Sequence, residues 1–169
     1  MSSGLAHAAE PKGALQVLFD ELRAASPLDA PAIRGKVLER LSDPSSDTVE
    51  IFLDRTETLI ENGDTAISKE LLDTVVTLAP NFAHGFALRG SLNLRVGDLE
   101  AARTDLLQAI TLEPRHIPAR LALSSLLIKE NASKEAYEVL RNTLVLDPQN
   151  PNALQQLDDL RPKLDGQEI

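Results

Sequence analysis

The chain has 169 residues and contains no cysteine and no tryptophan, and its aromatic residues are one tyrosine and four phenylalanines. The absence of cysteine excludes a thiol nucleophile and a disulfide framework, and it is compatible with both oxidising and reducing compartments. No stretch of 18 consecutive apolar residues occurs, so we expect no membrane-spanning helix. The eight glycines are dispersed along the chain and form no phosphate-binding loop.

Basic charge is also scarce. The formal net charge is −9, and residues 43–80 hold nine acidic residues against two basic ones. A nucleic-acid-binding surface needs clustered Lys and Arg to neutralise phosphates, and single strands also need aromatic side chains that stack on bases. Because the sequence offers neither, we expect no nucleic-acid partner.

The side chains that catalysis uses most often are few and dispersed. The three histidines are His7, His84 and His116, and none takes part in a His-x-x-x-His pair. We expect His116 in a loop between repeats and His84 exposed to solvent on a groove-facing position. A catalytic site needs titratable groups that converge with a nucleophile or a metal. We therefore predict that the protein is not an enzyme, with no catalytic residues, no metal and no cofactor.

A 34-residue period is the main feature that the sequence does contain. Pro80, Pro114 and Pro148 are 34 residues apart, and each follows one leucine by two residues and another by eight. A turn residue stands 17 positions before each proline, and a small residue stands 12 positions before it. The turn residues are Gly63, Gly97 and Asn131, and the small residues are Ser68, Ala102 and Ala136. A fixed period of this length indicates a solenoid of stacked units.

Each period contains two amphipathic helices. Apolar residues recur at steps near four from Phe82 to Val96 and again from Leu99 to Leu112. Gly97 between them suits a helix C-cap with positive φ, and Pro114 ends the second segment because proline cannot continue a helix. The small residues let paired helices cross closely, and stacking on the next pair buries the remaining apolar face.

These features resemble the tetratricopeptide repeat, with repeats at 49–82, 83–116 and 117–150. The resemblance implies an all-α fold, a right-handed α-solenoid of antiparallel helix pairs. The eighth position of the family is small, and here it is Thr56, Gly90 and Ser124. Arg55 and Arg89 replace the usual leucine of the seventh position. They are either structural arginines paired with acids of a neighbouring helix or a basic ladder for an anionic partner.

The segments on either side of the repeats also predict helices. We expect residues 10–42 to form a degenerate helical hairpin that covers the N-terminal face of the array as a fourth pair. Residues 151–163 predict a capping helix that Pro151 opens. A single domain would then span 10–163, with tails at 1–9 and 164–169. Asp47 and Glu50 have the spacing of a capping box for the first repeat.

The resemblance also implies a binding surface, because the first helices of successive tetratricopeptide repeats line a concave groove. The groove positions carry an apolar stripe, and exposed apolar surface with a polar rim is typical of interaction sites. The stripe is Leu53, Ile60, Leu94, Leu121 and Ile128. The full set of candidate partner-binding residues is Glu50, Leu53, Glu57, Ile60, Glu61, His84, Ala87, Ser91, Leu94, Arg95, Pro118, Leu121, Ser125, Ile128 and Lys129. Glu61, Arg95 and Lys129 follow one another along the array, so one end should be acidic and the other weakly basic.

The function that we expect is a non-catalytic adaptor that binds a peptide or protein segment in this groove. The alternative is a structural or self-associating module of a cell-envelope assembly. Chaperone-binding members of the family hold a C-terminal carboxylate with a Lys/Asn clamp. The clamp positions here are Leu53, Glu57, Leu88, Pro118 and Ala122. None of them matches the clamp, so we do not expect a partner of that class.

The N-terminal residues 2–9 resemble the end of a secretory signal peptide, with Ala6-His7-Ala8 as a small-x-small cleavage site. The layout of a hairpin followed by three repeats is also similar to that of small exported repeat proteins of alphaproteobacteria. Both resemblances imply a periplasmic protein of the cell envelope, with most of the signal peptide trimmed from this sequence. A cytoplasmic protein with an alanine-rich terminus is the alternative.

Overall fold

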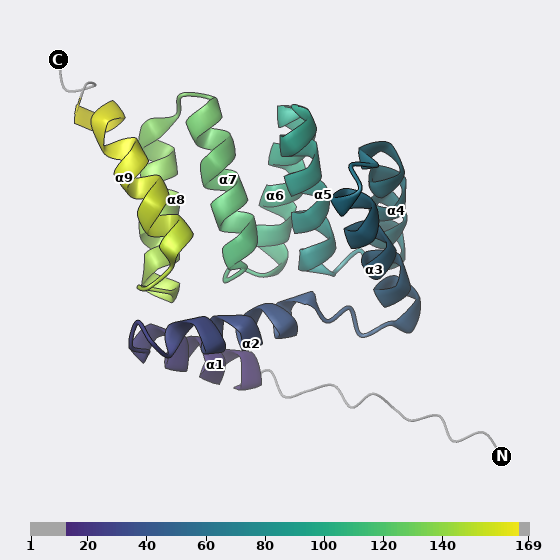
Figure 1. Cartoon of the computed structure of the whole chain (residues 1–169), viewed down its shortest axis with the longest axis horizontal. Helices are drawn as coiled ribbons and strands as arrows, with labels where there is room; N and C mark the ends of the chain where they lie inside the picture. The colour runs from purple at the N-terminus through teal and green to yellow at the C-terminus, as the bar shows by residue number, and fades with distance from the viewer. Residues whose placement is uncertain (1–12, 166–169) are drawn as a thin grey trace.

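The computed structural model describes residues 13–165, and this part of the chain contains nine α-helices and no strand. The helices are α1 (Gly13–Ala24), α2 (Ala30–Ser42), α3 (Asp47–Glu61), α4 (Thr65–Leu78), α5 (Ala83–Val96), α6 (Leu99–Leu112), α7 (Ile117–Lys129), α8 (Ser133–Leu146) and α9 (Pro151–Asp165). Helices α3 to α8 stand side by side as three antiparallel pairs, one to a repeat, and α9 follows them (Figure 1). The all-α solenoid predicted from the 34-residue period is confirmed.

The turn residues explain where the first helix of each pair ends. Gly63 and Gly97 have φ angles of 83° and 88°, and Asn131 has a φ of 60°. Glycine adopts this left-handed conformation without strain and asparagine tolerates it, whereas most other side chains clash. After Gly97, the Asp98 side chain accepts the Ala101 amide at 3.1 Å and caps α6. The turn inside the second repeat is therefore determined by its own residues.

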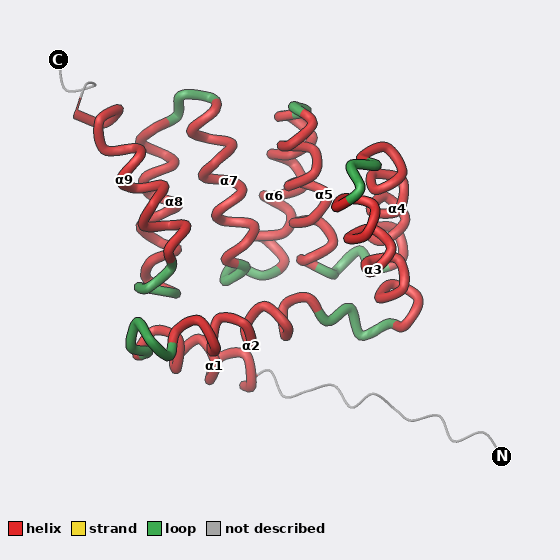
Figure 2. Tube along the Cα trace, viewed as in Figure 1, coloured by secondary structure: helices red, strands yellow, loops and turns green. Residues whose placement is uncertain are grey.

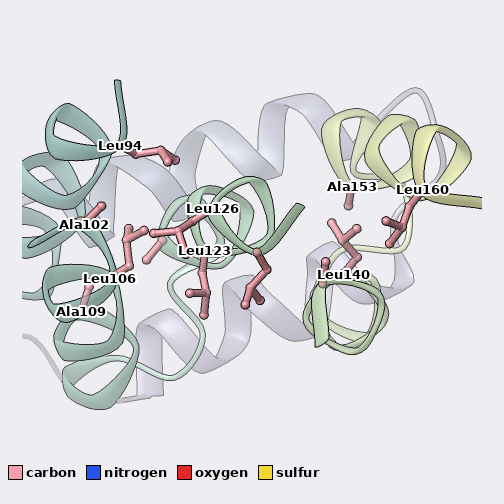
Figure 3. Packing of buried hydrophobic residues seen from close by; sticks show 13 residues of the cluster. Leu94, Ala102, Leu106, Ala109, Leu123, Leu126, Leu140, Ala153 and Leu160 are labelled. Carbon is pink, nitrogen blue, oxygen red and sulfur yellow. The ribbon is translucent and has the colours of Figure 1, made fainter. Parts of the chain in front are cut away.

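The hydrophobic core runs between the stacked helix pairs. Ser68, Ala102 and Ala136 are fully buried in equivalent places of the three repeats. A Cβ atom on Gly90 would lie 2.8 Å from Cγ of Leu106, so α5 and α6 cross too closely for a side chain there. Figure 3 shows the core continuing from α6 through α7 and α8 to α9, along residues such as Leu106 and Leu160. Stability therefore arises from the contacts of each pair with its neighbours.

The N-terminal hairpin lies in a different place from the one that the repeat pattern predicts. α1 contacts α8 and α2 contacts α5, and the two helices run across the upright helices of the array (Figure 1). The connections between successive repeats lie on the side that faces this hairpin (Figure 2). Phe19, Leu22 and Val37 of the hairpin are buried there together with Ile117 of α7. The prediction of a fourth pair on the N-terminal face is wrong, because the repeat junctions cover the apolar side of the hairpin instead.

Of the two helix starts predicted outside the repeat turns, the one at Pro151 is confirmed and the capping box of α3 is wrong. Ser46 is the N-cap of α3 and no side chain caps this helix, so Asp47 and Glu50 do not form the predicted capping box. α9 begins at Pro151, as expected for proline in a first helical turn. The predictions for residues 1–12, which include the signal-peptide-like segment, and for 166–169 lie outside the described residues.

Candidate functional site

A cavity of about 1310 Å³ opens between α2, α3, α5 and α7. Its apolar lining comes from the hairpin, the connection that follows it and the repeats, and consists of Leu18, Leu38, Pro44, Leu53, Ile60, Leu88 and Pro118. The solenoid thus provides the concave surface, and the hairpin closes one side of it. A concave site with apolar walls and a small number of polar groups is the usual form of a binding site.

One wall of this cavity carries a row of carboxylates. Glu50, Asp54, Glu57 and Glu61 all line the cavity. Their spacing of four, three and four residues places them on one face of α3. None of the four forms an ion pair with another residue of the described chain. This wall therefore presents negative charge beside apolar surface.

Another wall of the cavity is α2, which carries mixed charge. Lys36, Glu39 and Arg40 of this helix line the cavity, and Asp43 follows them in the connection to α3. The position of α2 is set by Arg34, whose guanidinium donates to both carboxylate oxygens of Asp147 at 2.5 and 3.1 Å and to the Gln149 carbonyl at 3.0 Å. The Asp147 side chain is fully buried, so this bidentate pair joins the hairpin to the end of the third repeat.

A second arginine also joins the hairpin to the repeat junctions. Arg115 donates to Gln16 of α1 at 3.1 Å, and its guanidinium lies 5.1 Å from the centre of the Phe19 ring. Glu113 accepts two hydrogen bonds from the same guanidinium, at 2.9 and 3.1 Å. Burial would raise the pKa of Glu113, but the hydrogen bonds from Arg115 outweigh this effect and the pKa is lowered. Glu113 is thus held in the charged form that orients Arg115 toward α1.

Two histidines meet at the edge of the cavity. Nδ1 of His84 lies 3.2 Å from Nε2 of His116, and Nδ1 of His116 accepts the Ala119 amide at 3.1 Å as the N-cap of α7. Burial lowers the pKa of His84 to about 4. Burial, and then the proximity of His84, lower the pKa of His116 to about 4 as well. Both imidazoles are therefore neutral at pH 7.

The predicted histidine positions need correction. His116 lies in the connection between α6 and α7, as predicted, but it is 0% exposed and caps α7. His84 lines the cavity but is not freely exposed, because one edge of its ring contacts His116. The repeat register gives no signal for this contact, because His84 is the second residue of the 83–116 repeat and His116 is its last, so the two are not equivalent positions.

The candidate groove residues separate into distinct environments. Those that line the cavity are Glu50, Leu53, Glu57, Ile60, Glu61, His84 and Pro118. Leu121 and Ser125 line a smaller depression of about 270 Å³ between α7 and α9. Ala87 and Leu94 are buried in the core, and Ile128 packs against it. Ser91, Arg95 and Lys129 are exposed but do not line the cavity.

The apolar stripe is therefore not continuous. Leu94 is only 9% exposed, so the expectation that it belongs to an exposed apolar stripe is wrong. The basic end formed by Arg95 and Lys129 also lies apart from the cavity, whose charge comes from α3 and α2 instead. The repeat register alone could not predict the contribution of Leu18, Lys36 and Leu38, because it does not specify where the hairpin docks.

Arg89 has a structural environment. Its guanidinium donates to both oxygens of Asp105 at 2.9 and 2.7 Å and to Asp73 at 2.8 Å. The hydrogen bonds to Asp105 raise the pKa of Arg89 further above its usual range. Arg55 is exposed and forms no ion pair within residues 13–165. The pairing of Arg89 supports the structural interpretation for that residue and removes it from a basic ladder.

Two further properties concern the described residues as a whole. Between Gly13 and Asp165, no three His, Asp or Glu side chains come together in a group that could hold a metal ion. No helix in the same range combines the length and the apolar character needed to cross a membrane.

Comparison with known proteins agrees with this architecture. The tetratricopeptide repeat family matches residues 83–116, which form the second repeat. A TPR repeat-containing protein of Rhizobium etli is 25% identical to the chain over 157 residues, which cover 92% of this chain and 77% of that protein.

Solved structures resemble the fold at low sequence identity. The first TPR of Spaghetti (RPAP3), bound to the HSP90 peptide SRMEEVD, has a TM-score of 0.66 at 16% identity and covers 69% of this chain and 93% of that chain. MamA has a TM-score of 0.56 at 21% identity and covers 92% of this chain and 94% of that chain. The match to MamA is too long for the three repeats and α9 alone, so it includes part of the hairpin region.

Proposed function

Because the chain folds as a tetratricopeptide-repeat solenoid, we propose that it is a non-catalytic interaction module that binds a peptide or protein segment in the cavity between α2, α3, α5 and α7. The observation that carries this proposal is the cavity itself, whose lining combines apolar side chains with a carboxylate row along α3. Apolar anchors supply most of the affinity of such a site, and surrounding charges set orientation and association rate.

The charge of the cavity defines the chemistry of the segment. The peptide SRMEEVD, to which the similar domain of Spaghetti is bound, ends in acidic residues and a carboxylate. In the present chain the clamp positions Leu53, Glu57, Leu88 and Pro118 line the cavity and none is basic. An acidic terminus would be repelled by the row on α3. We therefore propose a segment with leucine-like anchors and Lys or Arg on the side that faces α3.

Selection of peptides from a random phage-displayed library on the purified protein tests this function. We expect enriched peptides to combine apolar residues with Lys or Arg. Replacing Glu57 and Glu61 with Lys should slow association of an enriched peptide about tenfold at low salt and flatten its salt dependence. The matched control is Glu21→Lys with Glu70→Lys, which changes the net charge equally at exposed residues outside the cavity.

A separate variant tests the apolar side chains of the lining. Replacing Leu53 and Ile60 with Ala should mainly accelerate dissociation of the same peptide, because apolar contacts form after the encounter. Enrichment of acidic peptides, or unchanged binding in both cavity variants, would contradict the proposed site.

A second candidate function is self-association, which one observation favours. In the described chain α3 packs only against α4, because the hairpin docks elsewhere, and Ile51, Ile67 and Leu78 of this pair are exposed. A solenoid end without a polar covering helix favours association. Light scattering after size exclusion should then detect a dimer that Ile51→Lys with Ile67→Lys abolishes. Val145→Lys, at an exposed apolar residue of α8, is the control.

A periplasmic location stays a proposal that rests on the sequence of residues 1–9 and on the resemblance to exported repeat proteins. Fusion of the native gene, with its own upstream coding region, to alkaline phosphatase tests it, because this enzyme is active only after export. An inactive fusion that is nevertheless produced would support the cytoplasmic alternative.

A further inference from the structure

The contact between His84 and His116 determines where the protons of both rings lie. Nδ1 of His116 accepts the Ala119 amide, so this nitrogen carries no hydrogen. A neutral imidazole has one N–H, which in His116 must then be on Nε2. Nε2 faces Nδ1 of His84 at 3.2 Å and donates to it. Nδ1 of His84 is therefore an acceptor, and the hydrogen of the His84 ring must be on its Nε2 atom.

The neutral state of both rings follows from their surroundings. His116 is enclosed at the N-terminus of α7, where the helix dipole opposes positive charge. Glu113 faces His116 and favours the charged form, but burial outweighs this carboxylate. For His84, burial is the dominant effect, and the nearest ring besides His116 is Phe82, in an edge contact at 6.0 Å.

The Nε2 atom of His84 is accessible and has no partner among the described residues. No buried polar side-chain atom of residues 13–165 lacks a hydrogen-bond partner. Nε2 of His84 has no partner in this part of the chain, so it is not buried. His84 lines the cavity beside Leu88 and Pro118, so its accessible Nε2–H is available as a hydrogen-bond donor at this site.

We propose that His84 is a binding residue of the cavity, whose Nε2–H donates to a main-chain carbonyl oxygen of the bound segment, and that His116 is the positioning residue that holds the donor tautomer. This inference rests on the proposed function and adds the polar contact that fixes the segment. A main-chain carbonyl fits better than a carboxylate, because Glu50 and Glu57 line the same cavity and repel anions. A donor held in one place beside Leu88 and Pro118 favours one register, since a misplaced carbonyl would leave the donor unpaired.

The tautomer is measured in the free protein, so this step does not depend on a ligand. Long-range ¹H–¹⁵N correlation spectra at pH 7 distinguish protonated from unprotonated ring nitrogens. We expect hydrogen on Nε2 in both His84 and His116. In His116→Asn the side chain can still cap α7, because Asn is a favoured N-cap residue, but the imidazole that orients His84 is lost. His84 should then show a mixture of tautomers. Hydrogen on Nδ1 of His84 in the parent protein overturns the proposal.

The ligand contact is tested with a synthetic copy of the tightest-binding peptide from the phage-display selection. Each amide is replaced in turn by an ester, which weakens the preceding carbonyl as an acceptor. We expect one ester to reduce affinity about threefold to tenfold in the parent protein and to have little effect in His84→Phe. His84→Gln, which keeps an N–H donor, should restore part of the difference. Thermal melting of each variant checks that it is folded.

The outcomes separate this inference from the proposed function. If every ester has the same effect on affinity in the parent and in His84→Phe, the donor role of His84 is wrong. If binding of the peptide still depends on Glu57 and Glu61 in that case, the cavity remains the binding site. If selection yields no peptide that the cavity variants weaken, the proposed function fails and the carbonyl contact fails with it. The spectra of the free protein then decide the tautomer alone.

Discussion

The first and third repeats share one sequence pattern but differ in how much of the molecule surrounds them. The third pair, α7 and α8, contacts α6 on one side and α9 on the other, and α1 of the hairpin packs against α8. The first pair, α3 and α4, contacts the rest of the described chain only through α5. A repeat with one neighbour has less interface to stabilise it. The more weakly supported repeat is also the one that carries the carboxylate row of the cavity, so stability and the candidate site are separated along the solenoid.

Overpacking the close helix crossing should give the largest effect and should distinguish the two repeats. Ala136→Leu places a larger side chain at a fully buried position of the third repeat, and we expect a loss of about 3 kcal/mol from the free energy of unfolding of the whole domain. Ser68→Leu, at the equivalent place in the first repeat, should remove the helical signal of α3 and α4 while the remainder melts normally.

Circular dichroism during urea unfolding measures this difference, with Ala66→Leu at an exposed position of α4 as the control. Equal, complete unfolding in both variants would show that the first repeat is as strongly coupled as the third.

Removing the link between the hairpin and the third repeat should give the next largest effect. Arg34→Leu leaves the Asp147 carboxylate buried with Asn150 as its remaining side-chain partner, and we expect a loss of about 2 to 3 kcal/mol. Arg34→Lys should recover only part of this loss. It keeps the positive charge, but an ammonium cannot make the bidentate contact. Urea midpoints provide the measurement. Arg55→Leu, at an exposed arginine of the first repeat, should change little, and a parent-like Arg34→Leu would argue against the link.

Lowering the pH should destabilise the junction of the second and third repeats, where the two buried histidines lie. Their pKa values are about 4 in the folded protein, below the ordinary value of 6.5. Between these values the unfolded chain binds more protons, so stability falls as the pH falls. From pH 6.5 to 5.5 we expect a loss of about 1 kcal/mol for each imidazole that stays neutral.

Urea titrations at several pH values test this loss, and the double variant His84→Gln with His116→Asn should show a flatter profile over the same range. His7 lies outside the described residues and is unchanged in this comparison. A slope as steep in the double variant as in the parent would assign the pH dependence to other groups.

The smallest effect concerns the carboxylate row of the first repeat. Glu57 has Asp54 three residues before it and Glu61 four residues after it on α3, and like charges at this spacing are unfavourable. Glu57→Lys should therefore raise the stability of the first repeat by about 0.5 kcal/mol at low salt. Thermal melting at low and high salt measures the gain, which salt should remove. Glu21→Lys on α1, which has no acidic residue three or four positions away, is the control, and an equal gain there would show that net charge alone is responsible.

The repeats were predictable from local residues because their geometry repeats. Gly97 marks a turn that needs positive φ, Pro114 ends a helix, and Ala102 marks a close crossing, and each of these constraints acts within one period. The same register identified Leu53, Glu57, Ile60 and His84 as groove positions, and these residues do line the cavity. It failed for Leu94, because the register does not reveal which apolar residues of a first helix turn into the core.

The sequence by itself determined the all-α solenoid, the boundaries of its repeats and the acidic character of α3, because these depend on spacing and charge along the chain. Only the tertiary structure decided that the hairpin crosses the repeat junctions, that Arg34 meets Asp147 and that His84 meets His116. The physical reason is that these contacts join residues whose separation along the sequence is not a whole number of 34-residue repeats, so the repeat register does not relate them. Their position depends on how two apolar surfaces fit together in three dimensions, and the hairpin has the same apolar pattern whichever surface of the array it covers.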